Sequence, residues 1–318
     1  MYKILCIIFI LLFILLISHN YNEYYTENNS ENNKYIIPKN VKYLKKKGVK
    51  TGLGDRIGTY ITYSLLSEIY NIEIYTTWEK SDRGNEYPDN IFEFIKFPDR
   101  LIFVSEEEYD NLSNVPELQF RWVYHGYDYI PETLHRSLTE DKQINMSSED
   151  MMKAYNKICN QIEYKKDLPR GWENRPNIIH IRRGDKKRNI DNHKERIQTI
   201  INKYKNEEWI ITSDDDIYNL DIPNLIKPKW NKDNKIRTLE EFFYYKHCRK
   251  IIQSVLGKKM GGGWSGFSYV PFKLGQAKYN NDKPILFSCC KDEEKTRFTH
   301  AKSYANKPLE NILLFNDI

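Results

Sequence analysis

Two arginines that directly follow an apolar strand can hold a phosphorylated ligand, and this chain has such a pair near its middle. In NIIHIRRGDKK, residues 177–187, an apolar run is followed at once by two arginines, a glycine and an aspartate. A guanidinium group binds phosphate oxygens through two parallel hydrogen bonds and stays charged. Arg182 and Arg183 therefore predict a diphosphate clamp in which Asp185 orients one arginine. A solvated charged turn is the alternative.

Three consecutive aspartates follow a second apolar strand in WIITSDDD, residues 209–216. Asp214 and Asp216 form a D-x-D pair, which in many sugar-nucleotide enzymes holds a divalent metal on the diphosphate. In the other interpretation, Asp214 or Asp215 accepts hydrogen bonds from a base or ribose while another carboxylate caps the next helix. Helix capping alone is the third possibility.

The first of two glycine-rich turns is TGLGDR, residues 51–56, between a predicted strand and a predicted helix. Glycines at 52 and 54 let backbone amides approach a ligand at the N-terminus of that helix. Gly52, Gly54 and Asp55 are therefore candidate substrate-binding residues. An ordinary strand-to-helix turn would have the same pattern.

The second turn is GGGWSGFS, residues 261–268, which places two hydroxyl groups at the start of another predicted helix. Serine hydroxyls and backbone amides at a helix N-terminus form a cradle for phosphate groups. Ser265, Phe267 and Ser268 are therefore candidate donor-binding residues. The alternative is a loop whose glycines only supply positive φ angles.

The elements that must position these clusters alternate along the chain. Strands are predicted at 41–44, 72–77, 100–104, 119–124, 177–181, 209–212, 251–255 and 284–287. Helices are predicted at 57–70, 91–95, 148–164, 192–204, 239–248 and 267–274. The segment DLPRGWENRP, 167–176, interrupts this alternation and indicates a domain boundary. Two α/β domains with parallel sheets are expected, and such sheets bind ligands beyond the carboxyl ends of their strands.

The N-terminal region differs from the rest. Residues 4–17 are an unbroken apolar run, about 21 Å long as a helix and therefore short for a typical bilayer. No small-x-small cleavage pattern follows, so an uncleaved signal anchor, 1–19, is favoured over a cleaved signal peptide. The polar segment 20–40 predicts a stem. The expected domains are then 41–170 and 171–318, in the lumen of the secretory pathway as a single-pass type II membrane protein.

Composition narrows the class of partner. The chain has 49 Lys and Arg against 44 Asp and Glu, a net charge of +5, which is low for a dedicated nucleic-acid-binding protein. A basic pocket for a phosphorylated small molecule fits these numbers. The five cysteines have no zinc-site spacing, and a disulfide is allowed without a readable pairing. Glycosylation sequons begin at Asn28, Asn111 and Asn145.

In this order, the four clusters resemble motifs of the fucosyltransferase superfamily, which includes α-1,2-, α-1,6- and protein O-fucosyltransferases. HIRRGD looks like its H-x-R-R-x-D motif, and WIITSDDD resembles the strand-S-D-D segment of the α-1,2 branch. KHCRKIIQS, 246–254, followed by SGFS resembles the K-H-x-I-I-S-N-S-S-F-S stretch, and GLGDR resembles the N-terminal loop. Asp55 replaces the usual Asn, Lys186 replaces an aromatic residue, and 255–264 resembles an insertion.

The resemblance implies a GT-B fold of two Rossmann-type domains facing a cleft. It implies inverting, metal-independent transfer of a sugar, fucose from GDP-fucose, to a hydroxyl of a glycan or glycoprotein, with no cofactor. Arg183 and Arg182 would stabilise the departing diphosphate, with Asp185 orienting them. A general base is expected, for which Asp55 and His125 are candidates.

The same resemblance assigns the binding residues. His180, with Asp214 or Asp215, would contact guanine or ribose, and Ser265, Phe267 and Ser268 belong to the phosphate-binding turn. Gly52, Gly54 and Asp55 would line the cleft from the acceptor domain. Two alternatives remain. One is a single-domain, metal-dependent glycosyltransferase that uses Asp214 and Asp216, and the other is a non-catalytic, membrane-anchored glycan-binding protein.

Overall fold

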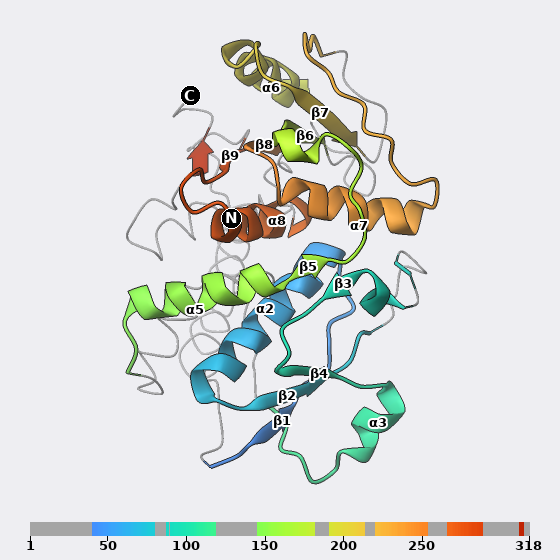
Figure 1. Ribbon diagram of the computed structural model, residues 1–318, viewed down its shortest axis with the longest axis vertical. Helices are drawn as coiled ribbons and strands as arrows, with labels where there is room; N and C mark the ends of the chain where they lie inside the picture. Colours follow the sequence, from blue (N-terminus) through green and yellow to red (C-terminus); the bar gives the residue numbers. More distant parts are fainter. Residues whose placement is uncertain are drawn as a thin grey trace, which may run out of the picture.

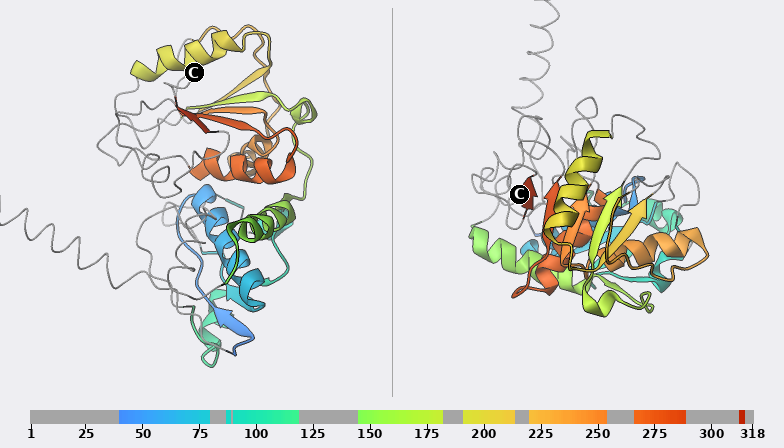
Figure 2. Two further views of the ribbon diagram at one scale, coloured as in Figure 1. Left: turned by 90° about the vertical axis from the view of Figure 1, so that its left-hand side faces the viewer. Right: turned by 90° about the horizontal axis from the view of Figure 1, so that it is seen from above.

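The computed structural model describes most of the chain beyond the predicted stem and confirms the α/β class. The described residues are 40–79, 87–88, 90–118, 145–181, 191–213, 220–253, 266–288 and 312–314, with only the backbone given for 191–193, 213, 288 and 312–314. Two parallel sheets lie one above the other, with helices between them (Figures 1 and 2). The two sheets agree with the prediction of two strand-and-helix units.

The first sheet has three parallel strands in the order β1-β2-β4. Their bounds are Tyr43–Lys45 for β1, Glu73–Thr76 for β2 and Leu101–Phe103 for β4. Leu44 pairs with Ile74, which pairs with Leu101, and all three side chains are buried. The helix α2, Leu53–Tyr70, connects β1 to β2 and packs against the sheet. This connection is the parallel crossover that the alternating pattern predicts.

Smaller elements complete this half of the molecule. A 3-10 helix spans Ile91–Glu93, β3 spans Ile95–Lys96, and β3 pairs antiparallel with β5, Glu163–Tyr164. The helix α5, Ser148–Gln161, begins with a side-chain cap, because the Ser147 hydroxyl accepts a hydrogen bond of 3.1 Å from the amide of Asp150. A side-chain acceptor there satisfies an amide that has no partner within the helix.

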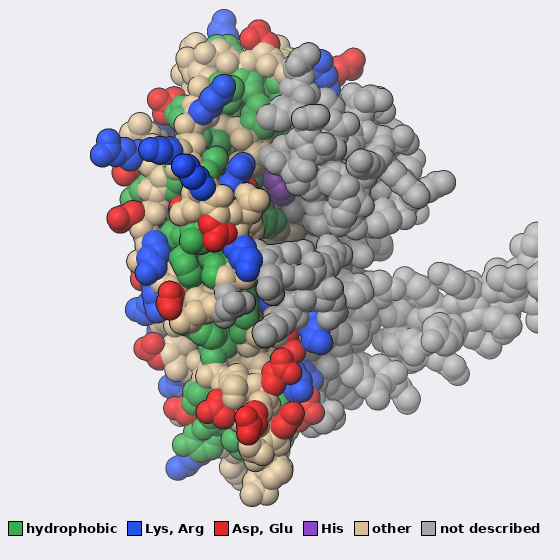
Figure 3. All heavy atoms as spheres, turned by 90° about the vertical axis from the view of Figure 1, so that its right-hand side faces the viewer, with side chains coloured by type: hydrophobic (Ala, Val, Ile, Leu, Met, Phe, Trp, Pro, Cys, Tyr) green, Lys and Arg blue, Asp and Glu red, His purple; other side chains and the backbone are tan. Residues whose placement is uncertain are grey.

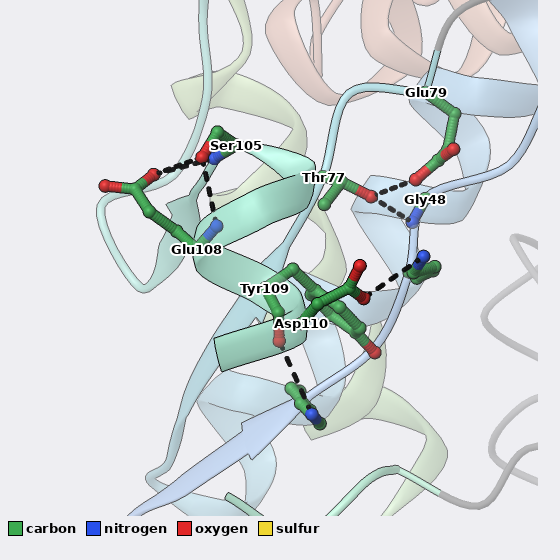
Figure 4. A network of polar contacts seen from close by, with 9 residues as sticks. Gly48, Thr77, Glu79, Ser105, Glu108, Tyr109 and Asp110 are labelled. Atoms are coloured by element: carbon green, nitrogen blue, oxygen red, sulfur yellow. Dashed lines mark hydrogen bonds and ion pairs between the residues drawn. The ribbon is translucent and has the colours of Figure 1, made fainter. Parts of the chain in front are cut away.

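A network of polar contacts attaches the short helix α3, Glu106–Asn111, to β1 and the segment after it (Figure 4). Ser105 and Glu108 form a reciprocal capping box at its start. Near its end, the Lys45 ammonium donates to the carbonyl of Tyr109 at 3.4 Å, and the Lys47 ammonium lies 3.5 Å from the Asp110 carboxylate. A helix of this length is not stable alone, so these contacts hold it.

The second sheet has five parallel strands in the order β10-β9-β8-β6-β7. Their bounds are Asn177–Ile181 for β6, Trp209–Ser213 for β7, Lys250–Gln253 for β8, Ile285–Ser288 for β9 and Ile312–Leu314 for β10. The helices between them are α6, Asp191–Lys203, α7, Asn234–Tyr245, and α8, Gly266–Lys278. β6 has its predicted bounds, whereas β10 was not predicted.

The two faces of this sheet bury different helices. Ile179 and Ile252 pack with Ile197 and Ile201 of α6 in one apolar cluster. Ile178, Ile210, Ile251 and Leu286 belong to a larger cluster that includes residues of α7 and α8. Neighbouring residues of a strand point to opposite faces, so a continuous apolar strand such as β6 is expected where helices cover both sides.

One apolar core runs between the sheets, because α2, α5 and α8 pack against one another there. It contains Leu66 of α2, Tyr155 of α5 and Leu274 of α8. Cys159 and Cys248 are free, buried thiols, and burial raises the pKa of Cys159 to about 12. The two halves therefore share a continuous hydrophobic interior.

A buried histidine lies at the edge of the second sheet where its strands begin. Nδ1 of His247 is 2.6 Å from the hydroxyl of Tyr279, and its ring centroid is 4.5 Å from that of Trp172. Burial, with smaller effects from the positive charges of Lys278, Lys246 and Arg175, lowers the pKa of His247 to about 3. The folded chain therefore holds this imidazole neutral.

This lowered pKa predicts acid sensitivity. Below pH 6.5 the unfolded chain protonates the imidazole of His247, while the folded chain does so only near pH 3. The free energy of unfolding should thus fall by about 2 kcal/mol from this residue between pH 7 and pH 5. Urea unfolding at both pH values measures this change. His247→Asn should show a smaller loss, and equal losses would contradict the assignment.

The surface charge and the apolar character of the helices bear on the class of partner and on membrane association. Lys and Arg are spread over the face in Figure 3 rather than gathered in one basic patch. Among the helices within the described ranges, none has the length and apolar character needed to cross a bilayer. The predicted anchor, the stem up to residue 39 and the predicted strand 119–124 lie outside the described residues.

Candidate active site

The carboxyl ends of β6 and β8 form the point at which the strand order of the second sheet reverses. β7 lies beside β6 on one side, and β8, β9 and β10 follow on the other. The chain leaves β6 toward α6 on one face of the sheet and leaves β8 toward α8 on the opposite face. Open α/β sheets bind their ligands in the crevice that this divergence creates.

Polar residues lie in register along this edge. Thr212 of β7 pairs with His180 of β6, and His180 pairs with Gln253 of β8. The row before them consists of Ile211, Ile179, Ile252 and Phe287. The change from an apolar row to a polar row occurs at the end of the sheet where a ligand would bind, so these side chains are candidates for contacting it.

Aromatic neighbours fix the position of His180. Its side chain is 8% exposed, and its ring centroid lies 5.6 Å from that of Tyr245 in α7 and 5.7 Å from that of Phe267 in α8. The hydroxyl of Tyr245 is hydrogen-bonded to the hydroxyl of Thr212. Two residues predicted from different motifs, His180 and Phe267, are therefore brought together at the crevice.

The N-terminus of α8 meets the N-terminus of α2 beside this edge. A Cβ atom placed on Gly54 would lie 2.1 Å from the carbonyl carbon and oxygen of Gly266 and 2.5 Å from the amide nitrogen of Phe267. Only glycine permits so close an approach between two backbones. Gly54, predicted to line the site from the first domain, therefore contacts the predicted phosphate-binding turn of the second.

The N-termini of α2 and α8 make their meeting point electrostatically positive. Each carries partial positive charge from backbone amides without partners in the helix, so their meeting favours an anion. The carboxylate of Asp55 already lies there, because a Cβ placed on Gly266 would be 2.6 Å from its Oδ1. Ser268, in the first turn of α8, is fully buried.

The glycine-rich motif is the start of a helix rather than a turn before one. The helix was predicted to begin at residue 57, but α2 begins at Leu53, with Gly52 as its extended N-cap residue. Gly54 and Asp55 therefore lie in the first helical turn, where the negative charge of Asp55 is favourable. Gly52 has no side chain that could cap α2. The amide of Leu53 donates instead to the Tyr87 hydroxyl at 2.8 Å.

Arg56 attaches this helix start to the rest of the first domain. Its side chain is fully buried, Nε donates to the carbonyl of Thr51 at 2.7 Å, and Nη1 donates to the carbonyl of Glu79. The guanidinium carbon lies 5.1 Å from the ring centroid of Trp78 and 5.4 Å from that of Tyr87. A planar cation that lies beside two aromatic rings and donates to two carbonyls fixes the orientation of the motif.

Several predicted site residues lie outside the described residues. These are Arg182, Arg183, Asp185, Asp214, Asp215, Asp216 and Ser265, together with the candidate base His125. Their strands do end at the crevice, since β6 ends at Ile181 and β7 at Ser213. Within the described ranges, no group of three or more His, Cys, Asp or Glu side chains is arranged to hold a metal.

Sequence reasoning missed two residues at this site. Gln253 was treated only as part of a motif, although it is a polar residue at the end of an apolar strand. Arg56 was included in the glycine-rich motif without a role. Its signal was an arginine directly after a helix N-terminus in a chain that otherwise prefers lysine.

No protein-family model matches the chain, and no curated protein matches it. Similar solved structures include fucosyltransferase NodZ from Bradyrhizobium, at 13% identity, covering 72% of this chain and 92% of that one, with a TM-score of 0.41. NodZ α-1,6-fucosyltransferase soaked with GDP-fucose is 15% identical, with 73% and 92% covered and a TM-score of 0.43. An Arabidopsis thaliana FUT1 variant in complex with GDP is 10% identical, with 85% and 74% covered and a TM-score of 0.48. All three of these TM-scores are below 0.5.

Proposed function

We propose that this chain is a glycosyltransferase that transfers fucose from GDP-fucose to a hydroxyl of a glycan or glycoprotein. The observation that supports this most directly is the position of the arginine pair. Arg182 and Arg183 are the first residues after β6, which ends at the reversal point of the second sheet. Residues that directly follow the strands at such a reversal point contact the ligand in open α/β sheets, and guanidinium groups suit a diphosphate.

The proposed reaction is an inverting displacement without a metal. The bond between the anomeric carbon and the β-phosphate oxygen breaks, and the acceptor oxygen forms a bond to the same carbon from the opposite face. The electron pair of the broken bond goes to GDP, where the arginines stabilise the developing negative charge. The acceptor proton goes to a base, for which Asp55 at the start of α2 is the candidate within the described residues.

Donor choice tests this proposal. The full chain is incubated with GDP-fucose, GDP-mannose and UDP-sugars, with and without EDTA, and release of the nucleotide is measured. We expect preference for GDP-fucose and unchanged turnover in EDTA. Preference for a UDP-sugar with Mn²⁺ would instead support the alternative in which Asp214 and Asp216 hold a metal.

The arginine clamp is tested by Arg183→Ala and Arg183→Lys. Loss of one preorganised donor to the leaving group should lower kcat roughly 100- to 1,000-fold in the alanine variant. Lysine keeps the charge without the paired geometry, so its loss should be smaller. Arg237→Ala is the matched control, because Arg237 lies on α7 in an ion pair with Glu241. If Arg183→Ala leaves nucleotide binding unchanged, a non-catalytic glycan-binding protein becomes the better account.

A further inference from the structure

Gln253 combines burial with an unsatisfied polar group at the reversal point of the second sheet. It is the last residue of β8, its side chain is 1% exposed, and it pairs with His180 of β6. Within the part of the chain that the structure describes, its Nε2 has no hydrogen-bond partner. A buried N–H group without an acceptor destabilises the folded state, so its presence here requires an explanation.

The direction of the side chain follows from the strand. Ile251 belongs to the core cluster that contains α7 and α8 residues, and Ile252 belongs to the cluster on the α6 face. Alternation along the strand therefore places Gln253 on the same face as Ile251. His180 occupies that face too, since its ring contacts Tyr245 and Phe267. Gln253 and His180 thus lie side by side across the reversal point.

We propose that Nε2 of Gln253 donates a hydrogen bond to a phosphate oxygen of the bound nucleoside diphosphate. This assignment rests on the proposed function and adds a binding residue to it. The unsatisfied amide then receives its acceptor from the ligand. A carboxamide has no charge of its own, so it can remain buried in the free protein at a lower cost than an arginine or lysine.

The surroundings favour a phosphate over the nucleobase as the acceptor. The chain passes from Gln253 to α8, whose N-terminus meets the N-terminus of α2 at Gly54 and Gly266. The Asp55 carboxylate already lies at that meeting point, so the helix N-termini do not by themselves select a phosphate. Arg182 and Arg183, the residues that follow β6 in the sequence, are phosphate-binding residue types. The choice of a phosphate over the nucleobase therefore rests on β6, the strand whose His180 pairs with Gln253.

The test uses Gln253→Met, which keeps the length of the side chain and removes its hydrogen bonding. Binding of GDP and of guanosine to the full chain is measured by calorimetry, and the Tm of the ligand-free protein is measured alongside. We expect GDP affinity to fall roughly 10- to 100-fold, the range for a hydrogen bond to a charged group. Guanosine affinity should remain unchanged.

The thermal stability of the ligand-free protein should not fall when Gln253 is replaced, although its affinity for GDP should. Since Gln253→Met removes a buried unsatisfied amide, its Tm should equal that of the wild type or exceed it by about 2 °C. Gln198→Met is the matched control, because Gln198 makes two hydrogen bonds of 2.9 Å to the backbone of Asp221. That variant should have a lower Tm and unchanged GDP affinity.

The outcomes separate this inference from the proposed function. Unchanged GDP affinity in Gln253→Met, or equal losses for GDP and guanosine, would overturn the phosphate contact while leaving a GDP-binding enzyme in place. A lower Tm for ligand-free Gln253→Met would show that the side chain has a structural role instead. Failure of the wild-type chain to bind any nucleoside diphosphate would overturn the proposed function itself.

Gln253→Glu places a negative charge beside the phosphate and should bind GDP more weakly than Gln253→Met.

Discussion

Gly54→Ala should abolish most of the transferase activity and destabilise the fold. The added Cβ would lie 2.1 Å from the backbone carbonyl of Gly266 and 2.5 Å from the amide nitrogen of Phe267. Backbone atoms cannot rotate away, so α2 and α8 must separate or tilt. Overpacking of this kind costs about 1–3 kcal/mol. Displacement of the site by about 1 Å should lower kcat/KM by roughly 100-fold.

Two neighbouring glycines provide graded controls for this prediction. A Cβ on Gly52 would meet no atom within 4 Å, so Gly52→Ala should lower the free energy of unfolding much less than Gly54→Ala. A Cβ on Gly266 would first meet Oδ1 of Asp55 at 2.6 Å, and that side chain can rotate. Gly266→Ala should therefore have an intermediate effect. Urea unfolding and kcat/KM for the donor sugar measure the series, and full activity in Gly54→Ala would contradict the contact.

Arg56→Met should give the second large effect, through loss of the buried guanidinium that holds the start of α2. The variant loses the hydrogen bonds to the carbonyls of Thr51 and Glu79 and the contacts with the rings of Trp78 and Tyr87. Two hydrogen bonds and two ring contacts are lost, and their loss is partly offset because the buried Nη2 of Arg56 has no acceptor within the described part of the chain. The free energy of unfolding should therefore fall by about 3 kcal/mol.

Arg56→Lys should recover only part of that loss, because an ammonium group lacks the planar set of donors with which Arg56 reaches both carbonyls. Arg100→Met is the matched control, since Arg100 is exposed and lies 3.9 Å from Glu68. Exposed pairs of this kind contribute little, so its free energy of unfolding should stay within about 0.5 kcal/mol of the wild type. A fully stable Arg56→Met protein would show that the guanidinium does not support the helix start.

Longer elements were predictable because their signals are local. β6 has its predicted bounds, since five consecutive buried residues indicate a strand covered on both faces. The start of α5 follows from Ser147 and Asp150, whose capping contact lies within four residues. The start of α2 was placed four residues too late because two glycines within TGLGDR suggest a turn. Gly54 is helical because it packs against Gly266, and no local pattern contains that contact.

The short strands were not predicted from the sequence, for a related reason. β3 and β5 are two-residue strands, so neither periodicity nor composition identifies them. Each exists because a distant partner supplies hydrogen bonds, as Ile95 and Tyr164 do for each other. The order of strands in the second sheet, and hence its reversal point between β6 and β8, is likewise a property of packing.

The sequence alone determined the α/β class, the candidate diphosphate clamp in HIRRGD and the resemblance of four motifs to fucosyltransferases. Those inferences depend on residue types and spacings that persist whatever the rest of the chain does. Tertiary structure decided that Gly54 meets Gly266, that His180 lies beside Gln253, and that Arg56 lies beside two aromatic rings. Each of these contacts joins segments far apart in the chain, so its geometry depends on how whole elements pack rather than on any local preference.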